Sequence, residues 1–118
     1  MTAGAASSAP TPFDRARALK NLEDSEDLLQ EIARIFLADY RADFTAMRAA
    51  LAANDAETLF RLAHTLKSSL ASFCADTAFN AAAALVKQVR AGKLDADQLA
   101  LVEALTDELA AALRAEIV

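Results

Sequence analysis

The chain has little glycine, proline, cysteine and histidine, and it has no tryptophan. Two glycines and two prolines in 118 residues leave few points at which a helix would be interrupted. Beta-branched residues are sparse as well, which disfavours a sheet. Hydrophobic residues make up 55% of the chain, and many of them are alanine or leucine, which have high helix propensity. The composition therefore predicts an all-α protein.

The single cysteine and the single histidine limit the chemistry. Cys74 has no second cysteine with which to form an intrachain disulfide, which fits a reducing cytoplasm. One histidine and one cysteine do not make a zinc ligand set. A serine or cysteine hydrolase would need a further histidine as base. We therefore expect no metal site, no hydrolytic activity and no cofactor of the protein's own.

The chain also lacks an excess of basic residues and a long apolar run. Its 12 Lys and Arg residues against 17 Asp and Glu residues give a formal net charge of −5, which disfavours nucleic acid as a partner. No apolar stretch is long enough to span a bilayer, and the first dozen residues do not resemble a secretory signal. We expect a cytoplasmic protein that binds neither nucleic acid nor membrane.

Two segments differ in composition. Residues 1–12, MTAGAASSAPTP, are small, polar and proline-containing, which predicts a disordered leader. Residues 13–118 suit one domain in length and carry helical periodicity. The expected helices are a short one over 13–22 and four longer ones near 24–52, 55–73, 76–91 and 95–117.

Each long helical segment has a recognisable start and an apolar stripe. The expected starts are Asp24 or Ser25, Asn54 in a capping box with Glu57, a position near Asp76, and Asp95 with Gln98; Gly92 is expected to end the third long helix. The expected buried positions are Phe13, Ala16, Leu19 or Leu22, Leu29, Ile32, Phe36, Tyr40, Met47, Leu51, Leu59, Leu62, Ala63, Leu66, Leu70, Phe73, Phe79, Ala82, Leu85, Val86, Val89, Val102, Leu105, Leu109 and Ala112. Short connections make consecutive helices antiparallel neighbours. The pattern predicts an antiparallel up-down four-helix bundle with a short additional N-terminal helix.

The only histidine, His64, is expected on the solvent side of the helix over 55–73. At about 100° per residue, the apolar stripe of this helix falls within about 60° of Leu59, whereas His64 falls about 140° away. Lys67 and Ser68 adjoin the imidazole one turn further along the helix. A lysine beside an exposed histidine is common on helices, so spacing alone does not separate a functional site from an ordinary surface.

The stretch AHTLKSSLASFCA resembles the signature of histidine phosphotransfer (Hpt) domains, the four-helix intermediates of bacterial two-component phosphorelays. His64, Lys67 and the small residue Ser69 match the family pattern. Ser68 and Cys74 stand where the family commonly has glycine. Serine adds only one hydroxymethyl group beside the imidazole, so we expect it to be tolerated.

The resemblance covers about residues 13–116 and implies a phosphocarrier, not an enzyme acting alone. His64 would accept a phosphoryl group from an aspartate of a receiver domain and pass it to another receiver. Lys67 would stabilise the added charge. Receiver domains of response regulators, a hybrid histidine kinase, or both would be the partners, and the receiver would supply magnesium. We expect the carrier to be a monomer.

The expected contact surface for a receiver lies around His64. The first candidates are Phe60, Arg61, Ser68 and Ala71. The preceding helix offers two flanks, Leu37 with Phe44 on one and Ala38, Arg41 and Thr45 on the other. The sequence does not decide which flank faces the partner.

Two alternatives remain open. One is the phosphate-accepting domain of a chemotaxis-type histidine kinase, which often carries a glutamate that hydrogen-bonds its histidine. No carboxylate lies three or four residues from His64, which disfavours this alternative. The other is a helical docking module that no longer carries phosphate. The retained spacing of His64 and Lys67 disfavours that one.

Overall fold

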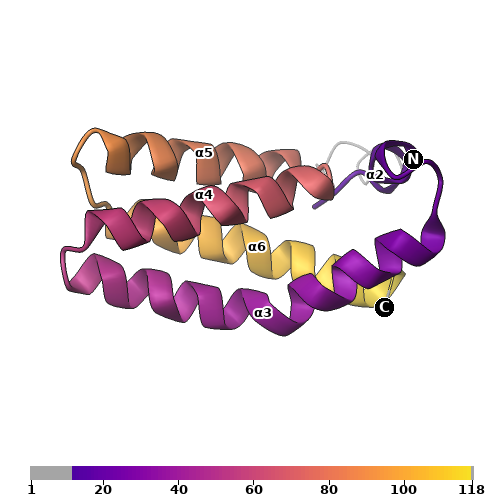
Figure 1. Cartoon of the computed structure of the whole chain (residues 1–118), viewed down its shortest axis with the longest axis horizontal. Helices are drawn as coiled ribbons and strands as arrows, with labels where there is room; N and C mark the ends of the chain where they lie inside the picture. Colours follow the sequence, from indigo (N-terminus) through magenta and orange to yellow (C-terminus); the bar gives the residue numbers. More distant parts are fainter. Residues whose placement is uncertain (1–11, 118) are drawn as a thin grey trace, which may run out of the picture.

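The computed structural model describes residues 12–117, and within this range it has five α-helices and no strand (Figure 1). The helices are α2 (Arg15–Asn21), α3 (Glu26–Ala52), α4 (Ala56–Ser72), α5 (Asp76–Arg90) and α6 (Ala96–Glu116). The predicted all-α class is confirmed, and each predicted helical segment is present. The predicted leader, residues 1–12, lies outside the described residues except for Pro12.

The four long helices lie side by side, and the chain reverses direction at each connection between them (Figure 1). α4 contacts α3 and α5, and α6 contacts α5 and α3. Each long helix can therefore bury one side against its neighbours and leave the other side to solvent. The short helix α2 lies at the end of the molecule where α4 passes into α5 (Figure 1).

Side-chain caps determine where three of the long helices begin. Ser25 caps α3, Asp55 caps α4 and Asp95 caps α6, each through a side-chain oxygen that accepts backbone N–H groups of the first turn. Ser25 and Asp95 are predicted caps, whereas the prediction that Asn54 caps α4 is wrong. Hydrogen bonds from Thr58 hold the pKa of Asp55 below its usual value.

Residues in the left-handed backbone conformation end three of the helices. Asn54 follows α3 with a φ of 57°, so it terminates that helix and cannot cap the next one. Cys74 follows α4 in the same way with a φ of 52°, and Gly92 follows α5 with a φ of 84°, as its predicted role requires. Asp24, the alternative to Ser25, also has a positive φ, of 63°.

Most of the predicted core is buried. The predicted positions that are buried are Phe13, Leu29, Phe36, Tyr40, Met47, Leu59, Ala63, Leu66, Leu70, Phe73, Ala82, Leu85, Val86, Val89, Val102 and Leu109. Those that are only partly buried are Leu19, Leu22, Ile32, Leu51, Leu62, Phe79, Leu105 and Ala112. The core thus follows one face of each long helix, as helical spacing predicts.

Two expectations about packing are wrong. Ala16 is exposed, and Ala18 is fully buried in its place. Phe13 precedes the first residue of α2, so its spacing to later residues does not define the inward face of that helix. Phe44 is fully buried and cannot belong to a docking flank. It follows Tyr40 by four residues and continues the buried stripe of α3.

Candidate functional site

The side chain of His64 is on the exposed side of α4, where helical spacing predicts it. The buried residues of α4, Leu59, Ala63, Leu66 and Leu70, point to the other side of the helix. His64 therefore does not contribute to the core. Its imidazole is accessible to a second molecule.

Phe60 and Arg90 form a stack that ends at His64. The ring centroids of Phe60 and His64 are 5.8 Å apart, with 29° between the ring planes. The guanidinium carbon of Arg90, at the end of α5, lies 5.7 Å from the centroid of the Phe60 ring. A cation over an aromatic face is attracted by the ring quadrupole. The aromatic ring beside the imidazole is therefore held by a cation from a neighbouring helix.

Lys67 extends from α4 toward the same neighbouring helix. Its Nζ lies 5.9 Å from the centroid of the Phe79 ring on α5. Phe79 is partly exposed, so its ring supports the lysine at the surface of the molecule. Neither Lys67 nor Arg90 forms an ion pair with a carboxylate of residues 12–117. The α5 side of His64 thus offers two cations that an added anion can use.

Arg90 is the residue of this site that sequence reasoning missed. Helical spacing finds neighbours of His64 on its own helix, and Arg90 lies 26 positions further along the chain. A signal existed nonetheless. The end of α5 meets the start of α4 when consecutive helices run in opposite directions, and Arg90 is the last residue of α5.

Ser68 uses its hydroxyl within its own helix. Its Oγ donates a hydrogen bond to the carbonyl oxygen of His64 at 3.4 Å, and Ser72 Oγ donates to the carbonyl oxygen of Ser68 at 3.3 Å. Serine hydroxyls inside helices commonly bond the carbonyl four residues back. The hydroxyl is therefore directed to the backbone. Together with the small exposed side chain of Ala71, it leaves low relief beside the imidazole.

Arg61 is also exposed, so all four predicted contact residues occupy the surface of α4. Phe60 is the one of them that is partly buried.

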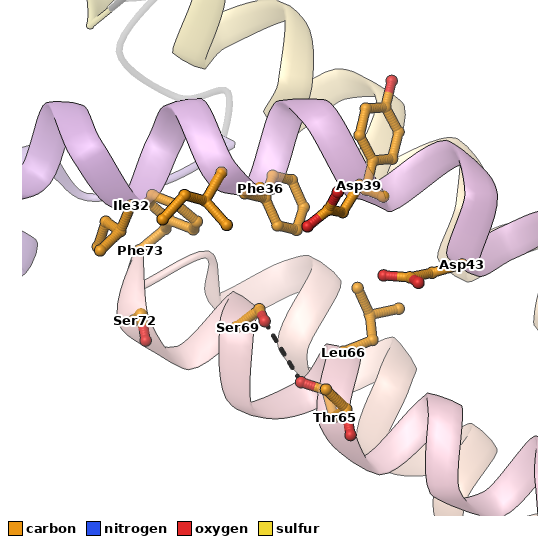
Figure 2. A pocket seen from close by; sticks show the side chains of 11 residues that line it. Ile32, Phe36, Asp39, Asp43, Thr65, Leu66, Ser69, Ser72 and Phe73 are labelled. Atoms are coloured by element: carbon orange, nitrogen blue, oxygen red, sulfur yellow. Dashed lines mark hydrogen bonds between the residues drawn. The ribbon is translucent and has the colours of Figure 1, made fainter.

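A groove lies on the other side of His64, between α3 and α4 (Figure 2). It encloses about 340 Å³. Thr65, the residue after His64, lines it together with Ser69, whose Oγ donates to the Thr65 carbonyl oxygen. Asp39 and Asp43 lie on the side of α3 that faces α4. Desolvation by burial, and then the charge of Asp39, raise the pKa of Asp43.

Neither of the flanks expected on α3 lines this groove. The α3 residues that do are Ile32, Ile35, Phe36, Asp39, Tyr40 and Asp43. Arg41 and Thr45 instead line a polar depression that also includes Glu103 of α6. Residues on either side of a buried stripe are equivalent in the sequence, and only the hand of the helix packing decides which side meets α4. The α3 residues that line the groove therefore differ from those of both expected flanks.

Two further properties bear on what the chain can hold. Within residues 12–117, no three His, Cys, Asp or Glu side chains gather closely enough to hold a metal ion. In the same part of the chain, every helix is too short or too polar to cross a membrane.

Comparison with known protein families gives a match to the Hpt domain over residues 31–115, from the second turn of α3 nearly to the end of α6. The chain belongs to the Hpt domain family. No curated protein and no solved structure matches it. Hpt domains are phosphocarriers of two-component signalling, and they interact with receiver domains and histidine kinases. The resemblance carried by the residues around His64 is thereby confirmed.

Proposed function

We propose that this Hpt domain accepts a phosphoryl group on His64 from the phosphorylated aspartate of a receiver domain and passes it to the aspartate of a second receiver. The observation that supports this most is the surroundings of the imidazole. It is exposed on α4, and within residues 12–117 the nearby cations of Lys67 and Arg90 contact aromatic rings and form no ion pair, in a chain whose family carries phosphate on histidine.

The transfer needs little from the carrier beyond a positioned nucleophile. The unprotonated imidazole nitrogen attacks phosphorus, a nitrogen–phosphorus bond forms, and the bond from phosphorus to the aspartate oxygen breaks to release a carboxylate. The second transfer runs the same exchange in the opposite sense toward another aspartate. Positioning and charge stabilisation dominate such reactions, so one exposed helix face is a sufficient contribution from this chain.

Lys67 is proposed to offset the charge that the phosphoryl group brings. Its Nζ lies 5.9 Å from the centroid of the Phe79 ring, and Lys67 is one turn along α4 from His64. Phe60 is proposed to hold the plane of the imidazole by stacking on it. Magnesium and the remaining catalytic groups are assigned to the receiver, because the carrier's part is limited to nucleophile and cation.

The scaffold of this carrier is proposed to be an antiparallel up-down bundle of α3 to α6, with α2 added, over residues 13–118. The reversal of the chain between successive long helices in Figure 1 supports it. We propose a monomeric carrier in the cytoplasm, where its receiver partners would act. Phe60, Arg61, Ser68 and Ala71 are proposed to contact the receiver, since all four lie at the surface of α4.

The test uses purified receiver domains from the same organism, charged with labelled acetyl phosphate and magnesium and then mixed with the full chain. We expect acid-labile, alkali-stable label on the wild type and none on His64→Gln. Glu108→Gln, an exposed substitution on α6, serves as the matched control and should take label as the wild type does. Equal labelling of His64→Gln would overturn the proposal. Label that arrives only from a histidine kinase with ATP would favour the chemotaxis-type alternative.

A further inference from the structure

The groove between α3 and α4 lies beside His64 but contributes no group to the transfer itself. We infer that it selects the receiver by charge. Its apolar floor would take an amphipathic helix of the receiver, and Asp39 and Asp43 would pair with a lysine or arginine on that helix. This inference rests on the proposed function.

The groove exposes the apolar side chain of Ile35 and part of that of Ile32, above the buried rings of Phe36 and Phe73. Ile35 is 53% exposed, and Ile32, Phe36 and Phe73 line the groove beside it. Exposed apolar surface next to a polar rim is typical of interaction sites. The groove follows α3 from Ile32 to Asp43, which is about 17 Å at a rise of about 1.5 Å per residue. About three turns of a partner helix fit that length.

The two carboxylates on this groove have no cation of their own. Asp39 and Asp43 are four residues apart, so they lie on one side of α3, and neither forms an ion pair or hydrogen bond within residues 12–117. Elsewhere on α3, Glu31 pairs with Arg34 and Arg48 pairs with Glu103. The raised pKa of Asp43 accords with a carboxylate that is partly desolvated beside a like charge.

The charges around His64 also fix an orientation for the partner. The α5 side carries the cations Lys67 and Arg90, and the α3 side carries the carboxylates Asp39 and Asp43. A receiver must bring its anionic aspartyl phosphate to His64, so that part of it faces the cations. A basic helix of the same receiver would then face the carboxylates. The reversed orientation would set like charges against each other, and like charges across an interface are costly.

Two other occupants fit the groove less well. In a twofold contact between copies of this chain, the same patch would meet itself and bring four carboxylates together. The segment before the described residues, 1–11, contains no lysine or arginine and so has no side chain to pair with Asp39 or Asp43. A basic helix of the receiver is the occupant that the charges favour.

The first experiment compares the wild type with the double variant Asp39→Asn/Asp43→Asn in transfer from the receiver that labels the wild type best. We expect KM for that receiver to rise about tenfold, while the rate at saturating receiver stays unchanged. We also expect added salt to raise KM of the wild type more than that of the variant, because the variant has lost the charges that salt screens. Glu108→Gln, which removes one carboxylate outside the groove, should leave KM unchanged. An unchanged KM in the Asn variant would overturn the inference.

A charge reversal identifies the partner side. At low receiver concentration, the variant Asp39→Lys/Asp43→Lys should no longer accept phosphate from the same receiver. A receiver in which the facing lysine or arginine is replaced by glutamate should restore phosphate transfer to this variant. Failure of every such receiver substitution to restore transfer would overturn the inference. If the wild type takes no label at all, the proposed function fails. In that case, the Kd for binding of the unphosphorylated receiver to the carrier tests the role of the groove. An equal Kd for the wild type and the Asn variant would overturn the inference.

Discussion

The ring of Phe60 connects Arg90 to His64. The guanidinium lies over one aromatic ring, and that ring stacks on the imidazole. A cation placed in this way has two effects. It holds the ring that orients the nucleophile, and it adds positive potential near the point where the phosphoryl group arrives.

We predict that Arg90→Ala slows transfer to His64 about two- to fivefold, as expected for an exposed cation–π contact of about 0.5–1 kcal/mol. The contact is made in the folded chain, so the variant should also lose up to about 1 kcal/mol of stability while it keeps the fold, as urea unfolding would show. Single-turnover labelling measures the rate. Lys87→Ala, which removes an exposed cation one turn earlier on α5, is the matched control. A loss of the same size in the control would assign the effect to net charge alone.

Lys67 is predicted to matter more, because its ammonium can bond the phosphoryl oxygens directly. Charge-assisted hydrogen bonds contribute about 1.5–3 kcal/mol, so we expect Lys67→Ala to slow transfer at least about tenfold. Lys67→Arg keeps the charge and should recover part of the rate. The far-ultraviolet circular dichroism of all three proteins should coincide. A wild-type rate in Lys67→Ala would remove the role assigned to this residue.

At the scale of the helices, the ends of α3 and α4 are built alike. Asn54 and Cys74 each follow the last turn with a positive φ, and in each case the next backbone N–H donates back to a carbonyl of that turn. Asparagine tolerates this conformation better than other side chains, and glycine has no Cβ to clash. Hpt domains commonly carry glycine where this chain has Cys74. The structure gives that preference a backbone reason.

We predict that Cys74→Gly is more stable than Cys74→Ala by about 1 kcal/mol, because both lose the thiol and only glycine relieves the left-handed backbone. Urea unfolding of the two variants measures the difference. The comparison between variants is needed because Cys74 is buried and its Sγ accepts a hydrogen bond from Asn21, so either variant loses packing relative to the wild type. Equal stability of the two variants would contradict the prediction.

The helices could be predicted because capping residues and apolar spacing are local features of the sequence. The surroundings of His64 could be predicted only in part. Spacing along one helix predicts that His64 is exposed and that Lys67 adjoins it. Arg90 and the carboxylates of Asp39 and Asp43 depend on which helix sides meet, and residues on both sides of the α3 stripe look alike in the sequence. The hand of the packing, a property of the whole molecule, separates them.

At the scale of the whole molecule, α2 is fastened to the connection between α4 and α5. Both Nη atoms of Arg17 donate to the carboxylate of Asp76, at 2.8 and 3.3 Å, and the backbone N–H of Asp14 donates to the carbonyl oxygen of Cys74 at 3.2 Å. Phe13 is buried beside these bonds. The family match begins within α3, so this attachment extends the molecule beyond the matched region.

The attachment of α2 should make stability depend on pH. The hydrogen bonds from Arg17 lower the pKa of Asp76 in the folded chain. A carboxylate whose pKa is lowered by folding stabilises the fold above its unfolded pKa, and this contribution is lost as pH falls through the folded value.

Asp76→Asn should therefore be slightly less stable than the wild type at neutral pH, and the difference should shrink as pH is lowered below about 4. Urea unfolding at a series of pH values measures it. Arg17→Ala/Asp76→Asn should be no less stable than Arg17→Ala, since that single substitution already removes the pair with Asp76 together with the ion pair between Arg17 and Asp14. A difference between wild type and Asp76→Asn that stays constant with pH would show that the ion pair does not stabilise the attachment.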